Sequence, residues 1–410
     1  MNGNVTDLAR DIARCGRCGK CRSVCPVFRE LLDEPMVARG KVQLYKAVLK
    51  GHLEYTEHYR RIISHCLLCR QCESHCPNGV PTASLVLAAR EQAVEKLSLP
   101  LIKKNVLQHF LTSSGRLNLV AKGLAFYQKS GLQGLLRKTK LLRGDLQEKE
   151  ALLPTIAPLP LRSALPRQIM PTGEPRMKVG YFTGCMSNHV FTDTGKNVVA
   201  LLRAAGCEVI IPRQCCCGLP ALAGGDRGSF MAMARKNLAG FLPTGIDALV
   251  VDCASCGSAW KYDYAAAGLK PPFPVYDISE FLTTQANFRA GGLKTPARVT
   301  YHDPCHLIRY QGITAQPREL LQGVAGLELV EMSDAGYCCG ASGSFQLEHR
   351  KIARSIGQKK GEAIVAAGAG VIATGCPSCR LQIQRVLGEI GSTARVVHPA
   401  DLLAESMLQG

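Results

Sequence analysis

The chain has 410 residues, 46% of them apolar and 20% charged, which is typical of a folded globular protein and argues against a disordered or fibrous one. Its outstanding features are 20 cysteines and a formal net charge of +18. The N-terminus lacks the pattern of a secretory signal, and no apolar run approaches the roughly 18 residues of a membrane span. We therefore expect a cytoplasmic protein with reduced thiols, whose cysteine clusters are candidate metal or redox sites.

Two groups of cysteines with the same spacing occupy residues 1–97. They are Cys15-x-x-Cys18-x-x-Cys21-x-x-x-Cys25-Pro26 and Cys66-x-x-Cys69-x-x-Cys72-x-x-x-Cys76-Pro77. This spacing is typical of bacterial ferredoxins, in which three thiolates of one loop reach three irons and the Cys-Pro cysteine binds the other cluster. The sequence therefore predicts two [4Fe-4S] clusters, one held by Cys15, Cys18, Cys21 and Cys76 and the other by Cys66, Cys69, Cys72 and Cys25. Tetrahedral zinc sites are the alternative.

Other residues of this region are candidates for supporting roles. Residues 40–49 and 83–96 have a helical period, so we expect a compact helical unit over 1–97. His65 and His75 flank the cysteines, and we expect them to be neighbours of the clusters or exposed side chains because each motif already supplies four thiolates. We expect Arg39-Gly40-Lys41 either to place a cation near a cluster or a partner, or to be an exposed helix start.

A basic segment and a proline-rich segment make up residues 98–175. Basic side chains are interleaved with leucines and aromatic residues over 98–144, which indicates amphipathic helices. These side chains are Lys103, Lys104, Arg116, Lys122, Lys129, Arg137, Lys138, Lys140 and Arg143. Six prolines between 150 and 175 exclude a helix or a central strand, so we expect a linker there.

Residues 176–410 repeat internally with an offset near 120. Cys216-Cys217-Gly218 matches Cys338-Cys339-Gly340, and Cys253-x-x-Cys256 matches Cys376-x-x-Cys379. Short β-branched runs alternate with segments of helical period, which predicts two pseudo-symmetric α/β domains with parallel sheets, over 176–290 and 291–410. The cysteines follow the strands, where sites in such sheets form.

Each repeat offers five candidate metal ligands. They are Cys185, Cys216, Cys217, Cys253 and Cys256 in the first half, and Cys305, Cys338, Cys339, Cys376 and Cys379 in the second. Five thiolates exceed what a cubane or a zinc ion needs, and the glycine after each cysteine pair allows a tight turn with the backbone close to the cluster. A thioredoxin-like dithiol at Cys376 and Cys379 is the alternative.

Five further residues of these halves are weighed separately. Cys207 is expected to be a buried apolar residue on a strand, and Cys215 to be packed rather than a ligand. His302, Asp303 and His306 bracket Cys305. We expect them either to transfer protons or orient thiolates, or simply to form hydrogen bonds at the strand end.

These motifs resemble the CCG domains of the heterodisulfide reductase catalytic subunit. Along the whole chain, the order of two ferredoxin motifs, a basic helical spacer and two CCG domains is similar to the glycolate oxidase iron-sulfur subunit and related lactate-utilisation proteins. The resemblance implies a multidomain α+β and α/β protein, with a helical ferredoxin-type domain followed by two CCG domains. It also implies a non-cubane iron-sulfur cluster in each complete five-cysteine set.

We find no Gly-rich dinucleotide fingerprint, no P-loop and no nucleophile elbow. Hydroxyacid oxidation needs a hydride acceptor, so the resemblance implies an electron-transfer subunit of a glycolate or D-lactate dehydrogenase complex. An FAD-dependent partner would hold the substrate site, and a quinone or another carrier would receive the electrons. The alternative is a catalytic subunit that reduces a disulfide at a CCG cluster.

The charge of +18 leaves the nature of a docking surface open. One expectation is that the basic helices bind anionic lipid on the inner face of the membrane or an acidic partner. The alternative is that they only cover the α/β core. We expect no nucleic-acid partner because no aromatic platform or reader motif accompanies the charge.

Overall fold

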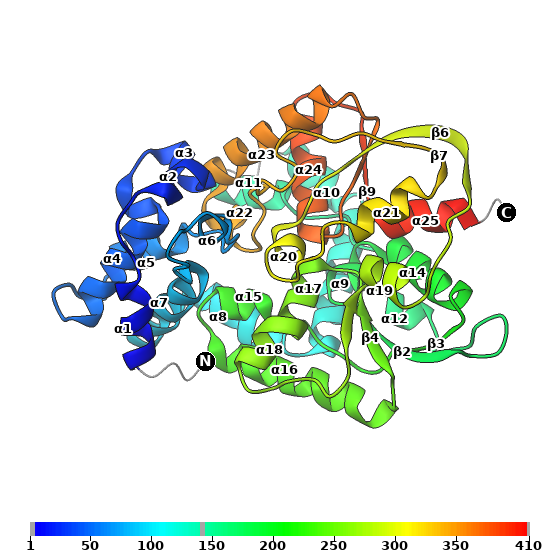
Figure 1. Cartoon of the computed structure of the whole chain (residues 1–410), viewed down its shortest axis with the longest axis horizontal. Coiled ribbons are helices and arrows are strands. Elements are labelled where there is room, and N and C mark those ends of the chain that lie inside the picture. Colours follow the sequence, from blue (N-terminus) through cyan, green and yellow to red (C-terminus); the bar gives the residue numbers. More distant parts are fainter. Residues whose placement is uncertain (1–4, 140–143, 408–410) are drawn as a thin grey trace.

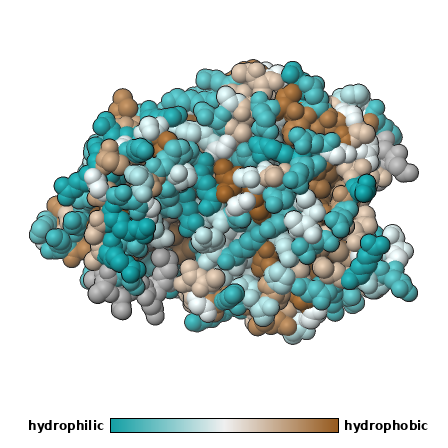
Figure 2. Space-filling model, viewed as in Figure 1, coloured by the Kyte–Doolittle hydropathy of each residue, from teal (hydrophilic) through white to brown (hydrophobic). Residues whose placement is uncertain are grey.

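The computed structural model describes residues 5–139 and 144–407. An N-terminal group of helices lies beside two α/β halves, each built around its own sheet (Figure 1). On the face drawn in Figure 2 hydrophilic residues prevail, and apolar residues form scattered groups. Within the described residues, every helix is too short or too polar to cross a bilayer.

The N-terminal region is helical, as the sequence predicts. Its elements are α1 (Val5–Ala13), α2 (Lys20–Val24), α3 (Pro26–Leu31), η1 (Glu34–Met36), α4 (Ala38–Leu49), α5 (Glu57–Ser64), α6 (Gln71–Ser74) and α7 (Thr82–Leu97). Thr56 caps α5 by accepting a hydrogen bond from the backbone N–H of Tyr59, at 3.1 Å. Helices α4, α5 and α7 bury Tyr45, Ile63, Leu85 and other apolar residues in one core. This core fixes the loops that carry the cysteines.

The basic segment forms a second group of helices. They are α8 (Leu101–Asn105), a π-helical turn η2 (Val106–Phe110), α9 (Ser114–Lys129), α10 (Leu132–Lys138) and α11 (Asp145–Ala151). Leu107, Ala121 and Ala125 are buried, whereas Leu101 and Phe126 are largely exposed. The helices thus cover the core only in part. Lys140 and Arg143 lie outside the described residues.

The first α/β half contains a five-stranded sheet of order β1-β3-β2-β4-β5. The strands are β1 (Gln168–Ile169), β2 (Met177–Phe182), β3 (Cys207–Ile210), β4 (Ala248–Val251) and β5 (Val275–Asp277), parallel except for the edge strand β1. The helices are α12 (Leu161–Ala164), α13 (Met186–His189), α14 (Thr192–Ala204), α15 (Leu219–Ala223), α16 (Arg227–Phe241), η3 (Leu242–Thr244), α17 (Ala254–Ser258), η4 (Ala259–Asp263), α18 (Tyr264–Ala266) and α19 (Ile278–Thr284). Strand β4 is buried on both faces, as expected of a central parallel strand.

The second half repeats this topology with a four-stranded parallel sheet of order β7-β6-β8-β9. The strands are β6 (Gly292–Tyr301), β7 (Ala325–Leu329), β8 (Val371–Ala373) and β9 (Arg395–Val397). The helices are α20 (Cys305–Ile308), α21 (Gln316–Gln322), α22 (Phe345–Glu348), α23 (Arg350–Ala366), α24 (Pro377–Glu389) and α25 (Pro399–Met407). Because β3-β2-β4-β5 corresponds strand by strand to β7-β6-β8-β9, the predicted pseudo-symmetry is confirmed.

The two halves share one hydrophobic core. Helix α25 of the second half packs on α14 of the first, and α21 packs on α19 in the pseudo-symmetric contact. Val198, Phe281, Leu320 and Leu403 from these four helices are buried in the same cluster. The halves are therefore joined through apolar packing as well as through the chain.

The proline-rich segment differs in one respect from the expected linker. It contains the short helix α12 and the edge strand β1. Leu161 of α12 is fully buried in the shared core. Pro160 lies immediately before α12, where a missing N–H is tolerated, so the prolines limit these elements in length without preventing them.

Candidate metal centres

The two ferredoxin-type loops have the same backbone conformation. Arg17 and Gly19 in the first loop have φ of +55° and +85°, and Leu68 and Arg70 at the equivalent positions have +54° and +56°. Three of these four residues are not glycine, so the left-handed conformation is held against a steric cost. It curls each loop so that its first three cysteines face a common space.

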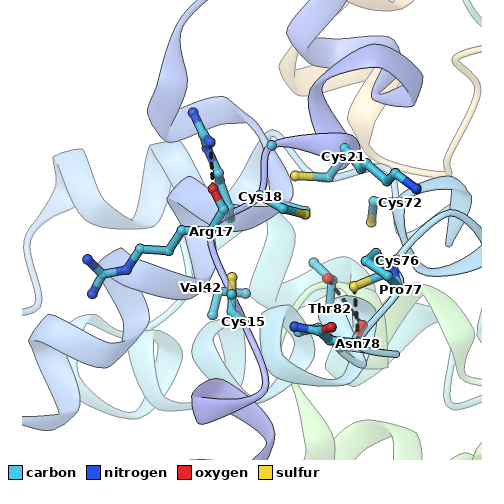
Figure 3. A pocket seen from close by; sticks show the side chains of 16 residues that line it. Cys15, Arg17, Cys18, Cys21, Val42, Cys72, Cys76, Pro77, Asn78 and Thr82 are labelled. Atoms are coloured by element: carbon cyan, nitrogen blue, oxygen red, sulfur yellow. Dashed lines mark hydrogen bonds between the residues drawn. The ribbon is translucent and has the colours of Figure 1, made fainter.

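The outer cavity lies under the first loop. The side chains of Cys15, Cys18, Cys21, Cys72 and Cys76 converge around it (Figure 3). Cys18 is exposed to solvent, whereas the other four are partly buried. Arg39 also lines this cavity, where it donates a hydrogen bond to the carbonyl of Arg17 at 3.0 Å and pairs with Glu34. Four thiols assigned to one cluster from the sequence thus surround one surface cavity.

The inner cavity lies next to it and is more deeply buried. Cys25, Cys66, Cys69 and Cys72 line it, and Cys72 lines the outer cavity as well. Burial raises the pKa of the Cys25 thiol to about 11. Lys41 lines the same cavity with only 2% of its surface exposed, and its ammonium group donates to the carbonyl of Met36. A buried cation therefore faces the four thiols.

The loop of the inner cavity is attached to the second α/β half through its backbone carbonyls. Tyr310 Oη donates to Leu68 O at 2.7 Å, Ser342 Oγ to Leu67 O at 2.9 Å, and Arg309 Nη1 to Cys69 O at 3.2 Å. The thiols of Cys69 and Cys338 form a hydrogen bond with each other. The second ferredoxin-type motif is thus in direct contact with the second five-cysteine set.

Both five-cysteine sets are brought together at the carboxyl ends of the parallel strands. In the first half, hydrogen bonds link Cys185 to Cys216, Cys216 to Cys217, Cys217 to Cys256 and Cys256 to Cys253. In the second half they link Cys305 to Cys338, Cys339 to Cys379 and Cys379 to Cys376. Hydrogen bonds from Cys216 and Cys256 lower the pKa of Cys217 to about 5. Each set therefore forms a compact group of sulfur donors suited to a thiolate-bound metal.

All ten of these cysteines line a single cavity of about 1170 Å³ between the halves and the N-terminal helices. Cys253 of the first set hydrogen-bonds to Cys376 of the second. Ser255 lies between the sets, with its Oγ 3.6 Å from Cys376 Sγ and 3.0 Å from His306 Nδ1. The two sets are thus neighbours, and one solvent-connected space serves both.

Three family models match these regions. A 4Fe-4S dicluster domain matches residues 11–80, the linker region of the glycolate oxidase iron-sulfur subunit matches 98–153, and a cysteine-rich domain matches 179–261 and 299–384. A probable glycolate oxidase iron-sulfur subunit of Bacillus subtilis is 31% identical, and the alignment covers 97% of this chain and 94% of that protein. The chain belongs to the glycolate oxidase iron-sulfur subunit family.

Two further relatives of this chain have different names, and their alignments cover less of it. A subunit of the fumarate reductase (CoM/CoB) of Methanothermobacter marburgensis is 37% identical over 56% of the chain and 46% of its own length. Lactate utilization protein A of Oceanobacillus iheyensis is 30% identical over 55% of the chain and 96% of its own length. The resemblance inferred from the sequence is confirmed, and these domains support iron-sulfur clusters as the bound groups.

The glycines of the Cys-Cys-Gly motifs have the predicted turn and also pack closely against a helix. Gly218 and Gly340 have φ of +87° and +83°. A Cβ on Gly218 would lie 2.9 Å from a ring carbon of Phe230, and one on Gly340 would lie 2.8 Å from the carbonyl oxygen of Ala353. The close approach is therefore to the following helix, α16 or α23. The backbone N–H of Gly340 also lies 3.5 Å from Cys338 Sγ, so packing against a helix is a further reason for glycine beside the expected approach of the backbone to a cluster.

The histidines and the aspartate near the cysteines lie in different surroundings. His65 is buried and stacks on His349 with ring centroids 3.7 Å apart, whereas the Nδ1 of His75 lies 3.0 Å from the carbonyl oxygen of Gln71 at the surface. Asp303 accepts two hydrogen bonds of 2.8 Å from Arg318, which gives it a structural partner at the strand end. Burial lowers the pKa of His306 to about 4.

Cys207 and Cys215 lie away from the cavities described above. Both are buried, and burial raises the pKa of each thiol to about 11. The Sγ of Cys215 lies 3.4 Å from Asn237 Oδ1, inside the packing of α16. These positions agree with the packed roles expected from the sequence.

Two cations near the cysteine-rich sets could not be singled out from the sequence. Lys360 on α23 is 3% exposed and donates to the carbonyls of Asp334 and Ala335, close to Cys338 and Cys339. Arg162 of α12 is half-buried and donates to Gln214 O at 2.6 Å, close to Cys185. Only the fold brings these cations from distant segments to the thiols.

Proposed function

We propose that this chain carries single electrons between a flavoprotein and a second carrier, as the iron-sulfur subunit of a 2-hydroxyacid dehydrogenase complex acting on glycolate or D-lactate. The electron path would run through the outer cavity, the inner cavity, the second five-cysteine set and the first one. The continuous series of neighbouring thiols carries this proposal.

The cavity linings support the ligand sets predicted from the sequence. Cys15, Cys18, Cys21 and Cys76 would hold one [4Fe-4S] cluster, and Cys25, Cys66, Cys69 and Cys72 the other. Each five-cysteine set would hold a further cluster. Bound iron-sulfur clusters would supply one-electron carriers, and no chemistry on the hydroxyacid is assigned to them.

Three contacts support the order of the path. Cys72 lines both ferredoxin-type cavities, Cys69 meets Cys338, and Cys253 meets Cys376. The chain's own residues keep neighbouring centres in register, because Tyr310, Ser342 and Arg309 hold the loop of the inner cavity by its carbonyls. The exposed Cys18 makes the outer cavity the natural point of contact with an electron-transfer partner.

The substrate site belongs to a partner in this proposal. The sequence has no flavin or nicotinamide fingerprint, and a hydride acceptor is needed to oxidise a hydroxyacid. An FAD-dependent subunit would oxidise the substrate, and a quinone or another carrier would accept the electrons. The names of the Bacillus and Oceanobacillus relatives support glycolate and lactate as the substrates to test.

The spacer helices would place this complex at the inner face of the cell membrane. Leu101, Ile102 and Phe126 are exposed apolar side chains, and Lys104 and Lys122 are exposed cations nearby in the sequence. Such a combination suits a peripheral contact with anionic lipid. Release from membranes by a salt wash would support this contact, and absence from the membrane fraction at low salt would refute it.

The first experiment is anaerobic purification of the chain with its bound partners, followed by iron, sulfide, zinc and flavin analysis. About sixteen irons per chain and a flavoprotein that reduces them with glycolate or lactate are expected. About eight irons together with zinc would restrict the clusters to residues 1–97 and refute the path through the cysteine-rich sets.

A second function is favoured by the large cavity shared by both five-cysteine sets. Its void of about 1170 Å³ includes the opening to solvent, through which a disulfide substrate would reach the clusters. The chain would then reduce a disulfide at a cluster of the CCG type. Disulfide-dependent turnover by the purified chain without a flavoprotein would favour this function over electron transfer alone.

A further inference from the structure

The two cysteine-rich halves differ at one position that faces the metal centre. Tyr181 of β2 pairs with Val250 of β4, three residues before Cys253, and Tyr301 of β6 pairs with Ala373 of β8, three residues before Cys376. The sheet register therefore equates the two tyrosines. It follows that the next residue is Phe182 in the first half and His302 in the second.

The surroundings of the two side chains are chemically different. Phe182 packs in an aromatic cluster, with its ring centroid 5.4 Å from that of Trp260 and 6.3 Å from that of Phe241. His302 is 1% exposed and lies beside the thiols of Cys339 and Cys379. The donor atoms of these three residues all lie within 4.8 Å of one another.

The imidazole of His302 lacks ordinary polar partners. Neither of its ring nitrogens has a nitrogen or oxygen partner among residues 5–139 and 144–407, and its polar neighbour is the thiol of Cys339. Buried polar groups normally have hydrogen-bond partners, so a buried imidazole whose polar neighbours are the thiols of a candidate metal site points to a ligand. Imidazole nitrogen and thiolate sulfur both bind iron, and in Rieske centres imidazole takes the place of thiolate.

We propose that His302 is a ligand to an iron of the cluster held by the second five-cysteine set. The first set has a phenylalanine at this position and binds its cluster through sulfur alone. The proposal rests on a cluster in the second set and does not depend on the partner or on the direction of electron flow. It would leave the two cysteine-rich centres electronically unequal.

The imidazole would take the iron site of one of the five thiolates, which would leave the cluster less negative and easier to reduce. The second centre would therefore have the higher reduction potential of the two. It is also the one in contact with the inner ferredoxin-type cavity through Cys338. Electrons arriving from the N-terminal region would then collect at the second centre before they reach the first.

Pulsed electron paramagnetic resonance tests the ligand directly. The full chain is purified anaerobically with ¹⁵N-labelled histidine and reduced in steps, so that each paramagnetic centre is observed in turn. The expected result is a strong ¹⁵N hyperfine coupling on a single centre of the wild-type protein. This measurement needs no substitution, so it does not depend on a variant that folds.

Three variants then assign the coupling. His302→Phe copies the first half, His302→Gln keeps a hydrogen-bond donor but removes the imidazole, and His306→Gln is the control within the same cavity. We expect the coupling to be lost in both His302 variants and kept in the control, with a lower midpoint potential for that centre alone.

Several results would overturn the proposal. They are the absence of a nitrogen coupling in the wild-type protein, its persistence in His302→Phe, zinc instead of iron in the second set, and full recovery of the wild-type spectrum and potential in His302→Gln. The last result would show that His302 donates a hydrogen bond to a cysteine or a sulfide.

Discussion

Replacing Lys41 by methionine removes the positive charge of the inner cavity while keeping most of the side-chain volume. Lys41 is 2% exposed and lies near Cys66, Cys25 and Cys72. Burial lowers its pKa, and nearby thiolates oppose that effect. A positive charge favours the reduced cluster, which carries one more electron. We therefore expect Lys41→Met to lower the reduction potential of the inner cluster.

The size of this shift follows from Coulomb's law. Taking about 8 Å as the charge separation and about 20 as the effective dielectric constant, the interaction of two unit charges is about 2 kcal/mol. Since about 59 mV corresponds to 1.4 kcal/mol for one electron, the expected decrease is about 90 mV. Solvent screening is weak at this site because the ammonium group is buried.

A redox titration of the anaerobic protein, followed by electron paramagnetic resonance, measures the shift. Lys50→Met is the matched control, because Lys50 caps the same helix α4 and is exposed. The control is expected to leave all potentials within about 20 mV of wild type, since an exposed charge is screened. An unchanged inner potential in Lys41→Met, with the cluster intact, would refute the electrostatic argument.

Three further predictions test the sites and the fold. Cys18→Ser is expected to remove about four irons per chain, and Cys207→Ala to remove none; equal iron losses measured by metal analysis would contradict the ligand assignment. Gly340→Ala is expected to lower the unfolding temperature more than Gly343→Ala, because both have positive φ but only Gly340 would bring its Cβ within 2.8 Å of another atom. Burial raises the pKa of Asp263 to about 7, so its neutral form is favoured in the folded state and stability should fall as the pH rises from about 4 to 7. Thermal unfolding of Asp263→Asn should lack this contribution, and an unchanged pH profile would contradict it.

Much of this architecture could be predicted from local sequence. The spacing of the cysteines predicted two groups of converging thiols in residues 1–97, and the offset between Cys217 and Cys339 predicted the repeat of the α/β halves. These signals are local because a curled loop or a strand end carries its own ligands. The helical and parallel-sheet character followed from hydrophobic periodicity for the same reason.

The long-range features could not be predicted in this way. Nothing near Cys69 indicates that it meets Cys338, and nothing near Lys360 indicates that it is buried beside thiols. Both depend on how separate units pack. The short helix α12 was not predicted, because six prolines indicated a linker. Its stabilising contact, the burial of Leu161, depends on the core shared by the two halves.

The shared core between the halves has a consequence for how the repeat can change. Helices α14 and α25, like α19 and α21, support each other whether or not a metal is bound nearby. One half can therefore lose its cysteines and persist as a scaffold for the other, whereas deleting either half would expose the apolar faces of its neighbour. For spectroscopy, this permits a chain without the five thiols of the first half, in which the second centre is observed free of signals from the first.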